Sequence, residues 1–109
     1  MNTVVIVGRV GRDPEIKYYE SGKVKTTFSV AVNRWDAKTK SEVTDWFNID
    51  VWDKQAEFAG EYVKKGRLVA IEGRILINTY TDATGSEKQW NTVAASNIRL
   101  LGSRRDEEQ

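Results

Sequence analysis

Two tryptophans in the segment Thr44 to Asp53, TDWFNIDVWD, lie on the polar side of a predicted strand. Alternate residues of a strand point to opposite faces, so Trp46 and Trp52 share one face with Asn48 and Asp50. The other face is apolar and consists of Phe47, Ile49 and Val51. An exposed indole forgoes much of the roughly 1.5 to 3 kcal/mol that burial of a large apolar side chain contributes, unless something stacks on it. Nucleobases stack on such rings, whereas a covering subunit or loop is the alternative explanation.

Two further predicted strands also carry an aromatic residue on their polar side. Val24 to Trp35 alternates regularly, and Trp35 falls in the polar row. That row consists of Lys25, Thr27, Ser29, Ala31, Asn33 and Trp35. In Arg67 to Tyr80, both Arg74 and Tyr80 oppose an apolar row. That apolar row consists of Val69, Ile71, Ile75 and Ile77. Because three strands share the arrangement, base stacking is favoured over coverage by a second layer.

The strands at the two ends of the chain have less regular patterns. Thr3 to Val10 is nearly all apolar and β-branched, so we expect a strand buried on both faces or bent at Gly8, central or at an interface. A short strand resumes at Ile16 to Tyr19. Gln89 to Leu101 is the last strand, and its mixed pattern leaves the register open. Trp90 has the parity of the apolar Ile98, which favours packing in the core or an interface over stacking.

One helix and two loops separate these strands. Helical spacing predicts a helix over Lys54 to Lys65, with Asp53 as its N-cap and Gly66 as its terminator. Lys64 and Lys65 would then complement the negative end of the helix dipole. The polar segments are predicted as loops, and these are Asp36 to Val43 and Thr81 to Lys88. Gly73 marks a bend or bulge in the strand after the helix.

Length and composition indicate one domain of a protein with no disulfides. The chain has 109 residues, no cysteine and no histidine. We expect a folded domain over residues 1–103 and a short, charged, disordered tail over residues 104–109. The tail holds two basic and three acidic residues of the chain's 17 and 16, which leaves 15 and 13, a net charge of +2, in the domain. No membrane-length apolar run or signal pattern is present, so a cytoplasmic protein is the default expectation.

Five strands with one short helix between the third and the fourth predict an all-β fold. This order is typical of the five-stranded Greek-key barrel called the OB-fold, whose second and third strands form the usual ligand face. The predicted outward aromatics fall on that face, and the two predicted loops flank it. Strand order and aromatic placement therefore agree on an OB-fold barrel.

The chain resembles the bacterial-type single-stranded DNA-binding proteins over residues 2 to about 101. The resemblance rests on four segments in order, which are NTVVIVGRVGRDPEIKY from Asn2, TDWFNIDVW from Thr44, EYVKKG from Glu61, and IEGRI from Ile71 followed by TYTD from Thr79. Each segment is modestly specific, and four at these spacings are strongly so. The resemblance implies binding of single-stranded DNA during replication, recombination and repair.

The resemblance also implies which residues bind DNA. The base-stacking positions of the family are matched by Trp35, Trp46, Trp52 and Tyr80; the third is commonly Phe and the fourth commonly Trp in the family. The basic positions along the strand path are matched by Lys17, Lys38, Lys54, Lys64 and Lys65, and we add Arg74 from the polar row of its strand. Positions before Tyr80 that can be basic in the family are Asn78 and Thr79 here, which puts backbone contact there in doubt.

Partners follow from the same resemblance. We expect single-stranded DNA as the ligand and a homotetramer, with the first strand and Phe47 as contacts. The long tail of the family, which ends in acidic residues and Phe, is absent from the given sequence, so partners recruited through that tail are not assigned. The cytoplasm, at the nucleoid, is the expected location, with an organellar location as the alternative.

Three other functions are compatible with parts of the sequence. A barrel nuclease could use acids as metal ligands, and the candidates are Asp45, Asp50, Asp53 and Glu72. Each acid is explained by a turn, a strand face or a cap, and no histidine or cysteine accompanies them, so we expect no catalytic residue, metal site or cofactor. An accessory OB-fold protein of replication restart is an alternative, although such proteins usually lack the full aromatic set. A protein-assembly module that uses the indoles to bind protein is the third.

Overall fold

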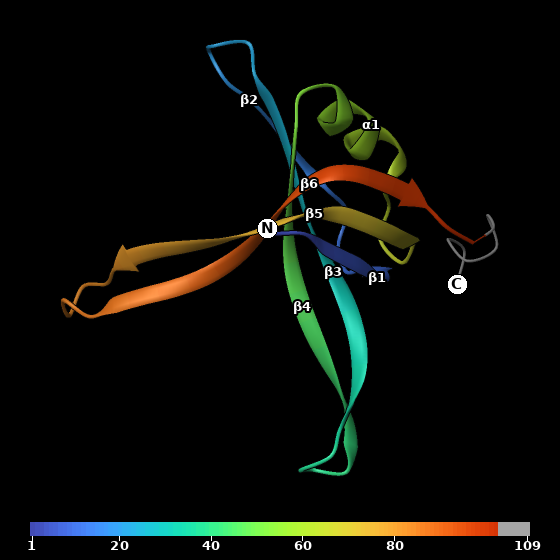
Figure 1. Ribbon diagram of the computed structural model, residues 1–109. Helices are drawn as coiled ribbons and strands as arrows, with labels where there is room; N and C mark the ends of the chain where they lie inside the picture. The colour runs from blue at the N-terminus through green and yellow to red at the C-terminus, as the bar shows by residue number, and fades with distance from the viewer. Residues whose placement is uncertain (103–109) are drawn as a thin grey trace.

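The computed structural model describes residues 1–102 (Figure 1). The predicted tail at residues 104–109, and the last residue of the predicted domain, lie outside this range. The elements are β1 Val4–Val10, β2 Glu15–Tyr18, β3 Val24–Asp36, β4 Ser41–Trp52, α1 Lys54–Tyr62, β5 Leu68–Thr81 and β6 Glu87–Leu100. No helix in this part of the chain is long and apolar enough to cross a membrane.

The sheet closes on itself as the predicted OB-fold barrel. Neighbouring strands follow the order β1-β5-β6-β4-β3-β2, and β1 also pairs with β3, which closes a ring of five strands. The short β2 lies outside this ring at the edge of β3. All pairings are antiparallel except the one between β4 and β6. The single helix α1 connects β4 to β5, as predicted, and lies against one end of the barrel (Figure 1).

Alternation along β3 and β4 fills the barrel with apolar side chains. Phe28, Val30, Ile49 and Val51 are fully buried, whereas their neighbours of opposite parity face outward. α1 covers the end of this core with its buried face, which consists of Ala56, Ala59 and the following residue Val63. The predicted inward and outward faces of β3 and β4 are therefore confirmed.

β1 is central, as predicted, because it pairs with both β5 and β3, but in the single chain only one of its faces is buried. Ile6 and Val10 enter the core, but Val5 and Val7 are 64% and 50% exposed. No other segment of residues 1–102 covers their outward face. Gly8 lies where β1 approaches β3, because an added Cβ would come within 2.3 Å of the Ala31 carbonyl oxygen. A glycine is therefore required at this closure point.

The helix is shorter than predicted, and it begins differently. α1 ends at Tyr62 because Val63 is extended, with φ −81° and ψ 123°, and enters the core. Lys64 and Lys65 therefore lie beyond the helix and not in its last turn. Asp53 occupies the N-cap position, but its side chain makes no capping hydrogen bond, since φ is 59° and ψ is −127° there.

Both predicted loops are also shorter, because the strands continue past the barrel as two projecting hairpins (Figure 1). Residues 37–40 connect β3 to β4, and residues 82–86 connect β5 to β6. Cross-strand side-chain bonds extend the first hairpin: Arg34 Nε donates to Asp45 Oδ2 at 2.7 Å. The predicted irregularity at Gly73 is confirmed as a register shift after Glu72. Ile77, predicted to face the core, lies beyond that shift on the projecting hairpin and is 66% exposed.

Candidate nucleic-acid interface

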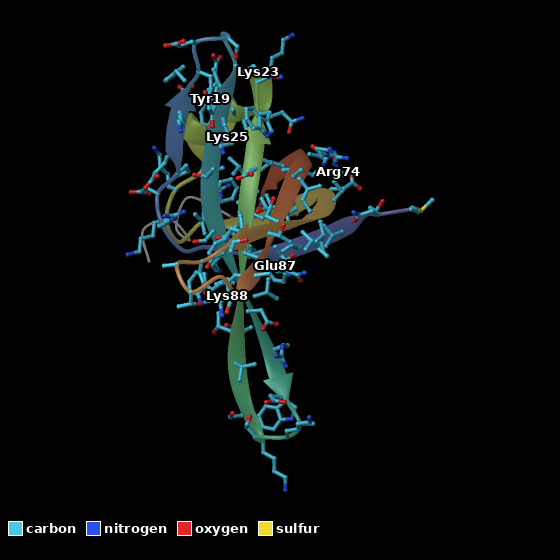
Figure 2. All side chains as sticks on the ribbon, turned by 90° about the vertical axis from the view of Figure 1, so that its left-hand side faces the viewer. Tyr19, Lys23, Lys25, Arg74, Glu87 and Lys88 are labelled. Atoms are coloured by element: carbon cyan, nitrogen blue, oxygen red, sulfur yellow. The ribbon has the colours of Figure 1, made fainter. Side chains whose placement is uncertain are left out.

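One row of side chains crosses three strands on the outer face of the barrel. Lys17 of β2 is opposite Lys25 of β3, and Lys25 is opposite Trp52 of β4. The Lys25 Nζ lies 5.4 Å from the centre of the Trp52 ring, and the Lys17 Nζ lies 5.1 Å from that of Tyr19. Tyr19 stacks on Trp52 with ring centres 5.7 Å apart. We call these four residues the Trp52 cluster; its Tyr19 and Lys25 lie at the β2–β3 end in Figure 2, with Lys23 beside them.

The cluster combines a planar surface with positive charge. An amine near an indole face is held there by the ring quadrupole, and the ring itself stays 43% exposed. Arg74 adds a further cation, because it lines a hollow of about 580 Å³ together with Trp52 and Ser96. The structure therefore brings together three predicted site residues: Lys17, Trp52 and Arg74.

Trp46 and Trp35 continue the same outer face along the first hairpin. Trp46 is opposite Ala31, and Trp35 is opposite Glu42. The Trp46 ring lies over Gly11, where an added Cβ would come within 2.2 Å of it. Both indoles are more than half exposed, at 60% and 66%. Two rings are thus held four residues apart along the hairpin, open to a ligand.

A second aromatic pair lies on the other hairpin. Tyr80 of β5 and Trp90 of β6 meet edge to face, with ring centres 5.4 Å apart. Trp90 is opposite Asn78 and is 44% exposed, so it lies outside the core, and its packing at an interface, the other possibility, stays a prediction. At Trp90, β6 has left the barrel. The Trp90 ring lines a hollow together with Asn48 and Asp50 of β4.

That second hollow has a volume of about 380 Å³ and lies between β3, β4 and the β5–β6 hairpin. Its lining residues are Arg12, Lys25, Thr27, Phe28, Asn48, Ile49, Asp50, Asn78, Trp90 and Thr92. Burial raises the pKa of Asp50, and the charge of nearby Lys25 opposes that rise. A half-buried carboxylate and two amides therefore face the same space as an indole.

The remaining predicted cations are more scattered. Lys38 lies in the loop at residues 37–40 after Trp35, and Lys54 begins α1 just after Trp52 and Asp53. The Lys65 backbone N–H donates to Asp13 Oδ1 at 2.9 Å, which ties Lys64 and Lys65 to the connection between β1 and β2. The same connection carries Gly11 under Trp46.

Sequence reasoning missed three residues of this surface. Lys25 stood in the polar row of its strand, but only the register of β3 against β4 shows that it meets Trp52. Tyr19 follows the end of β2, where no alternation predicts its direction. Trp90 shares the parity of the apolar Ile98, which predicts a core or interface position, but parity reports burial only where a strand lies in the barrel, and Trp90 lies beyond it.

A closed five-strand barrel with rings and amines on the outer face of β3 and β4 has the architecture of the ligand-binding OB-fold proteins. The model of the single-strand binding protein family matches residues 1–101, and the chain belongs to that family. It is similar to single-stranded DNA-binding protein 1 of Synechocystis, with 46% identity over 107 residues that cover 97% of this chain and 88% of that protein.

Two further similarities span more distant organisms. The single-stranded DNA-binding protein of Neisseria meningitidis is 39% identical over 109 residues, which cover 97% of this chain and 63% of that protein. The structure of the Plasmodium falciparum single-stranded DNA-binding protein in complex with single-stranded DNA matches with a TM-score of 0.83 and 28% identity. That match covers 94% of this chain and 96% of the other, so the fold is shared almost throughout.

Proposed function

We propose that this protein binds single-stranded DNA with little sequence preference, by stacking bases on its outward rings and pairing phosphates with its amines. The observation that carries the proposal is the outer face of β3 and β4, where Trp46 and Trp52 lie exposed and Lys25 meets Trp52. Every base has a planar face, so stacking tolerates any sequence. The family and the names of the similar proteins support the same ligand.

The proposed binding site is the outer surface that runs over both hairpins. Its base-stacking residues are Trp35, Trp46, Trp52 and Tyr80, and its phosphate-binding residues are Lys17, Lys38, Lys54, Lys64, Lys65 and Arg74. The net charge of the whole chain is only +1, so local placement of cations must supply the electrostatic attraction. Stacking is worth about 1 to 3 kcal/mol per base, so several rings engaged together give useful affinity.

The proposed role is protection of single strands during replication, recombination and repair, without catalysis, in the cytoplasm at the nucleoid. Among residues 1–102 no three acidic side chains gather into a group that could hold a metal ion. Asp45, one of the acids considered for a nuclease, is engaged by Arg34. A nuclease assay with added magnesium tests this part directly, since cleavage of an oligonucleotide by the pure protein would contradict it.

A homotetramer is proposed as the assembly. The uncovered apolar residues Val5 and Val7 support it, because exposed apolar strands of this kind associate. A lone module of low net charge would bind weakly, and several modules on one strand bind more tightly than their separate affinities suggest. Light scattering at micromolar concentration tests the assembly, and a monomer mass would contradict it.

Tryptophan fluorescence during titration with an oligothymidine tests the function. Stacked bases quench exposed indoles, so we expect a saturable loss of emission that a duplex of the same length does not produce. Binding that disappears completely at moderate salt would show that the rings contribute little. If no oligonucleotide binds, the indoles serve protein assembly instead.

A further inference from the structure

The hollow beside Trp90 has the size and the lining of a ligand pocket. Its volume of about 380 Å³ falls within the range of small-molecule sites, about 300 to 1,000 Å³. The β5–β6 hairpin leaves the barrel beside β4 (Figure 1), and residues of the hairpin and of β4 line the hollow. Trp90 lines this hollow together with four polar residues, which we call the floor of the hollow: Asn48, Asp50, Asn78 and Thr92.

The lining of the hollow offers both donors and acceptors of hydrogen bonds. The Asn78 amide N–H donates to Thr92 Oγ1 at 2.9 Å, and the Asn48 amide N–H makes a longer contact of 3.5 Å with the Asn91 carbonyl. Both amide carbonyl oxygens are left as acceptors. The Asp50 carboxylate is half-buried and receives no hydrogen bond or ion pair from any described residue; Lys25 acts on it only through its charge. A partly buried carboxylate without a donor is costly, so the part of the hollow beside Asp50 favours a ligand group that donates.

We infer that this hollow takes one nucleobase with an exocyclic amino group, stacked on Trp90 with its amino edge toward Asp50. The inference rests on the proposed function and adds a modest base preference to it. Cytosine, adenine and guanine each present an amino group, and a carboxylate accepts from the cytosine amino group in known base contacts. Thymine has a carbonyl oxygen where cytosine has its amino group, and this oxygen would face the carboxylate as a second acceptor. Arg12 and Lys25, also in the lining, suit the adjoining phosphates.

The test compares two oligonucleotides that differ only at the base edge. Oligo(5-methyl-dC) and oligo(dT) share the ring size and the methyl group, but the first has an amino group where the second has an oxygen. The ratio of their dissociation constants is measured at pH 8 for the wild type, for Asp50→Asn and for Glu42→Gln. Glu42 is the matched control, because it lies on the same face of β4, opposite Trp35, outside the hollow.

We expect Asp50→Asn to shift the ratio about fivefold toward oligo(dT), the low end of discrimination by a base-edge contact. The asparagine amide can donate to the thymine oxygen, which the carboxylate cannot. Glu42→Gln should tighten binding of both oligonucleotides equally and leave the ratio unchanged. An equal ratio in the wild type and Asp50→Asn would overturn the inference while leaving the proposed function intact. Failure of the wild type to bind either oligonucleotide would instead overturn the proposed function.

A second variant keeps the test decisive if Asp50→Asn does not melt cooperatively. Trp90→Leu removes the stacking ring at an exposed position, so folding should persist. It should weaken binding of both oligonucleotides and move the ratio in the same direction, because an unstacked base is no longer held against Asp50. A Trp90→Leu protein with unchanged affinity and an unchanged ratio would overturn the inference as well.

Discussion

The barrel and its two projecting hairpins are stabilised by different means. In the barrel, fully buried apolar residues such as Phe28 and Ile49 pack from opposed strands. In the hairpins, cross-strand pairs at the surface replace burial: Thr44 donates to Asn33 at 2.7 Å, and Tyr80 meets Trp90. Such pairs contribute roughly 0.2 to 1 kcal/mol each, far less than a core residue. The protein thus separates the part that makes it stable from much of the part that displays rings.

The largest effect should come from a truncation inside the barrel. Ile49→Ala should lower the free energy of unfolding by roughly 2 to 5 kcal/mol, because Ile49 is fully buried and a cavity remains. Ile77→Ala is the matched control on a hairpin and should change stability by less than about 0.5 kcal/mol. Urea denaturation of the two variants measures both values. Equal losses would show that the hairpin shares the barrel's packing.

Replacing the outward tryptophans should change DNA affinity and leave stability largely unchanged, the opposite of a truncation in the core. Trp46→Ala and Trp52→Ala should each weaken binding of an oligothymidine by about 1 to 3 kcal/mol while largely sparing stability. Phe58→Ala removes a partly exposed ring of α1 that is not among the proposed binding residues, and it should leave affinity unchanged. Titration and thermal unfolding on the same samples separate the cases. Unfolding or loss of the oligomer, with binding per folded chain retained, would make the indoles packing residues.

A smaller effect should distinguish the amines of the Trp52 cluster from other surface cations. Lys25→Gln should reduce the slope of log affinity against log salt by about 0.7, the amount for one phosphate contact on a single strand. Arg34→Gln, on the face of β3 opposite to Trp35 and already paired with Asp45, is the control and should leave the slope unchanged. Equal slopes in all three proteins would exclude a phosphate contact for Lys25.

The smallest effect concerns the loop of the second hairpin. Asp82 accepts bonds from the Thr84 and Ser86 backbone N–H groups at 2.9 and 3.0 Å, and the Thr84 hydroxyl bond is the main cause that lowers the pKa of Asp82. A carboxyl whose pKa is lower in the folded state stabilises the fold fully at pH values above its unfolded pKa, which is about 3.9. That contribution is lost as the pH falls through the folded pKa. The protection factors of the Thr84 and Ser86 amides, which compare the measured exchange rate with the intrinsic rate at each pH, should therefore fall below about pH 4 before the barrel opens. Asp82→Asn should remove this pH dependence; an unchanged profile would contradict it.

The sequence predicts the barrel better than the hairpins for a physical reason. Alternation reports burial, so the faces of β3 and β4 could be assigned wherever a core exists to bury one of them. Beyond the core, the strands continue through pairs of polar residues such as Arg34 and Asp45. Segments rich in such residues have the composition of loops, so the sequence predicts loops there. The same limit explains the error at Ile77 and the exposure of Trp90, which lie on strands that have left the barrel.

The surface was predicted in part. Parity placed Trp35, Trp46, Trp52 and Tyr80 outward, and the structure agrees that all four are exposed. The contact between Lys25 and Trp52 depends on how β3 registers against β4, and the stacking of Tyr19 depends on the turn after β2. Both contacts join residues that are far apart in the sequence, so local patterns do not predict them. Whether these residues bind DNA remains a prediction.

The strand order also determines when a growing chain can first fold. β1 pairs with β5, so that Val4 lies opposite Gly73, and β4 pairs with β6 near the end of the chain. At about 5 to 20 residues added per second, β1 emerges several seconds before its partner, with its apolar side chains uncovered. The strand that carries Trp90 is made last. Each new copy therefore passes through an interval of several seconds in which an apolar strand without its partner is open to aggregation.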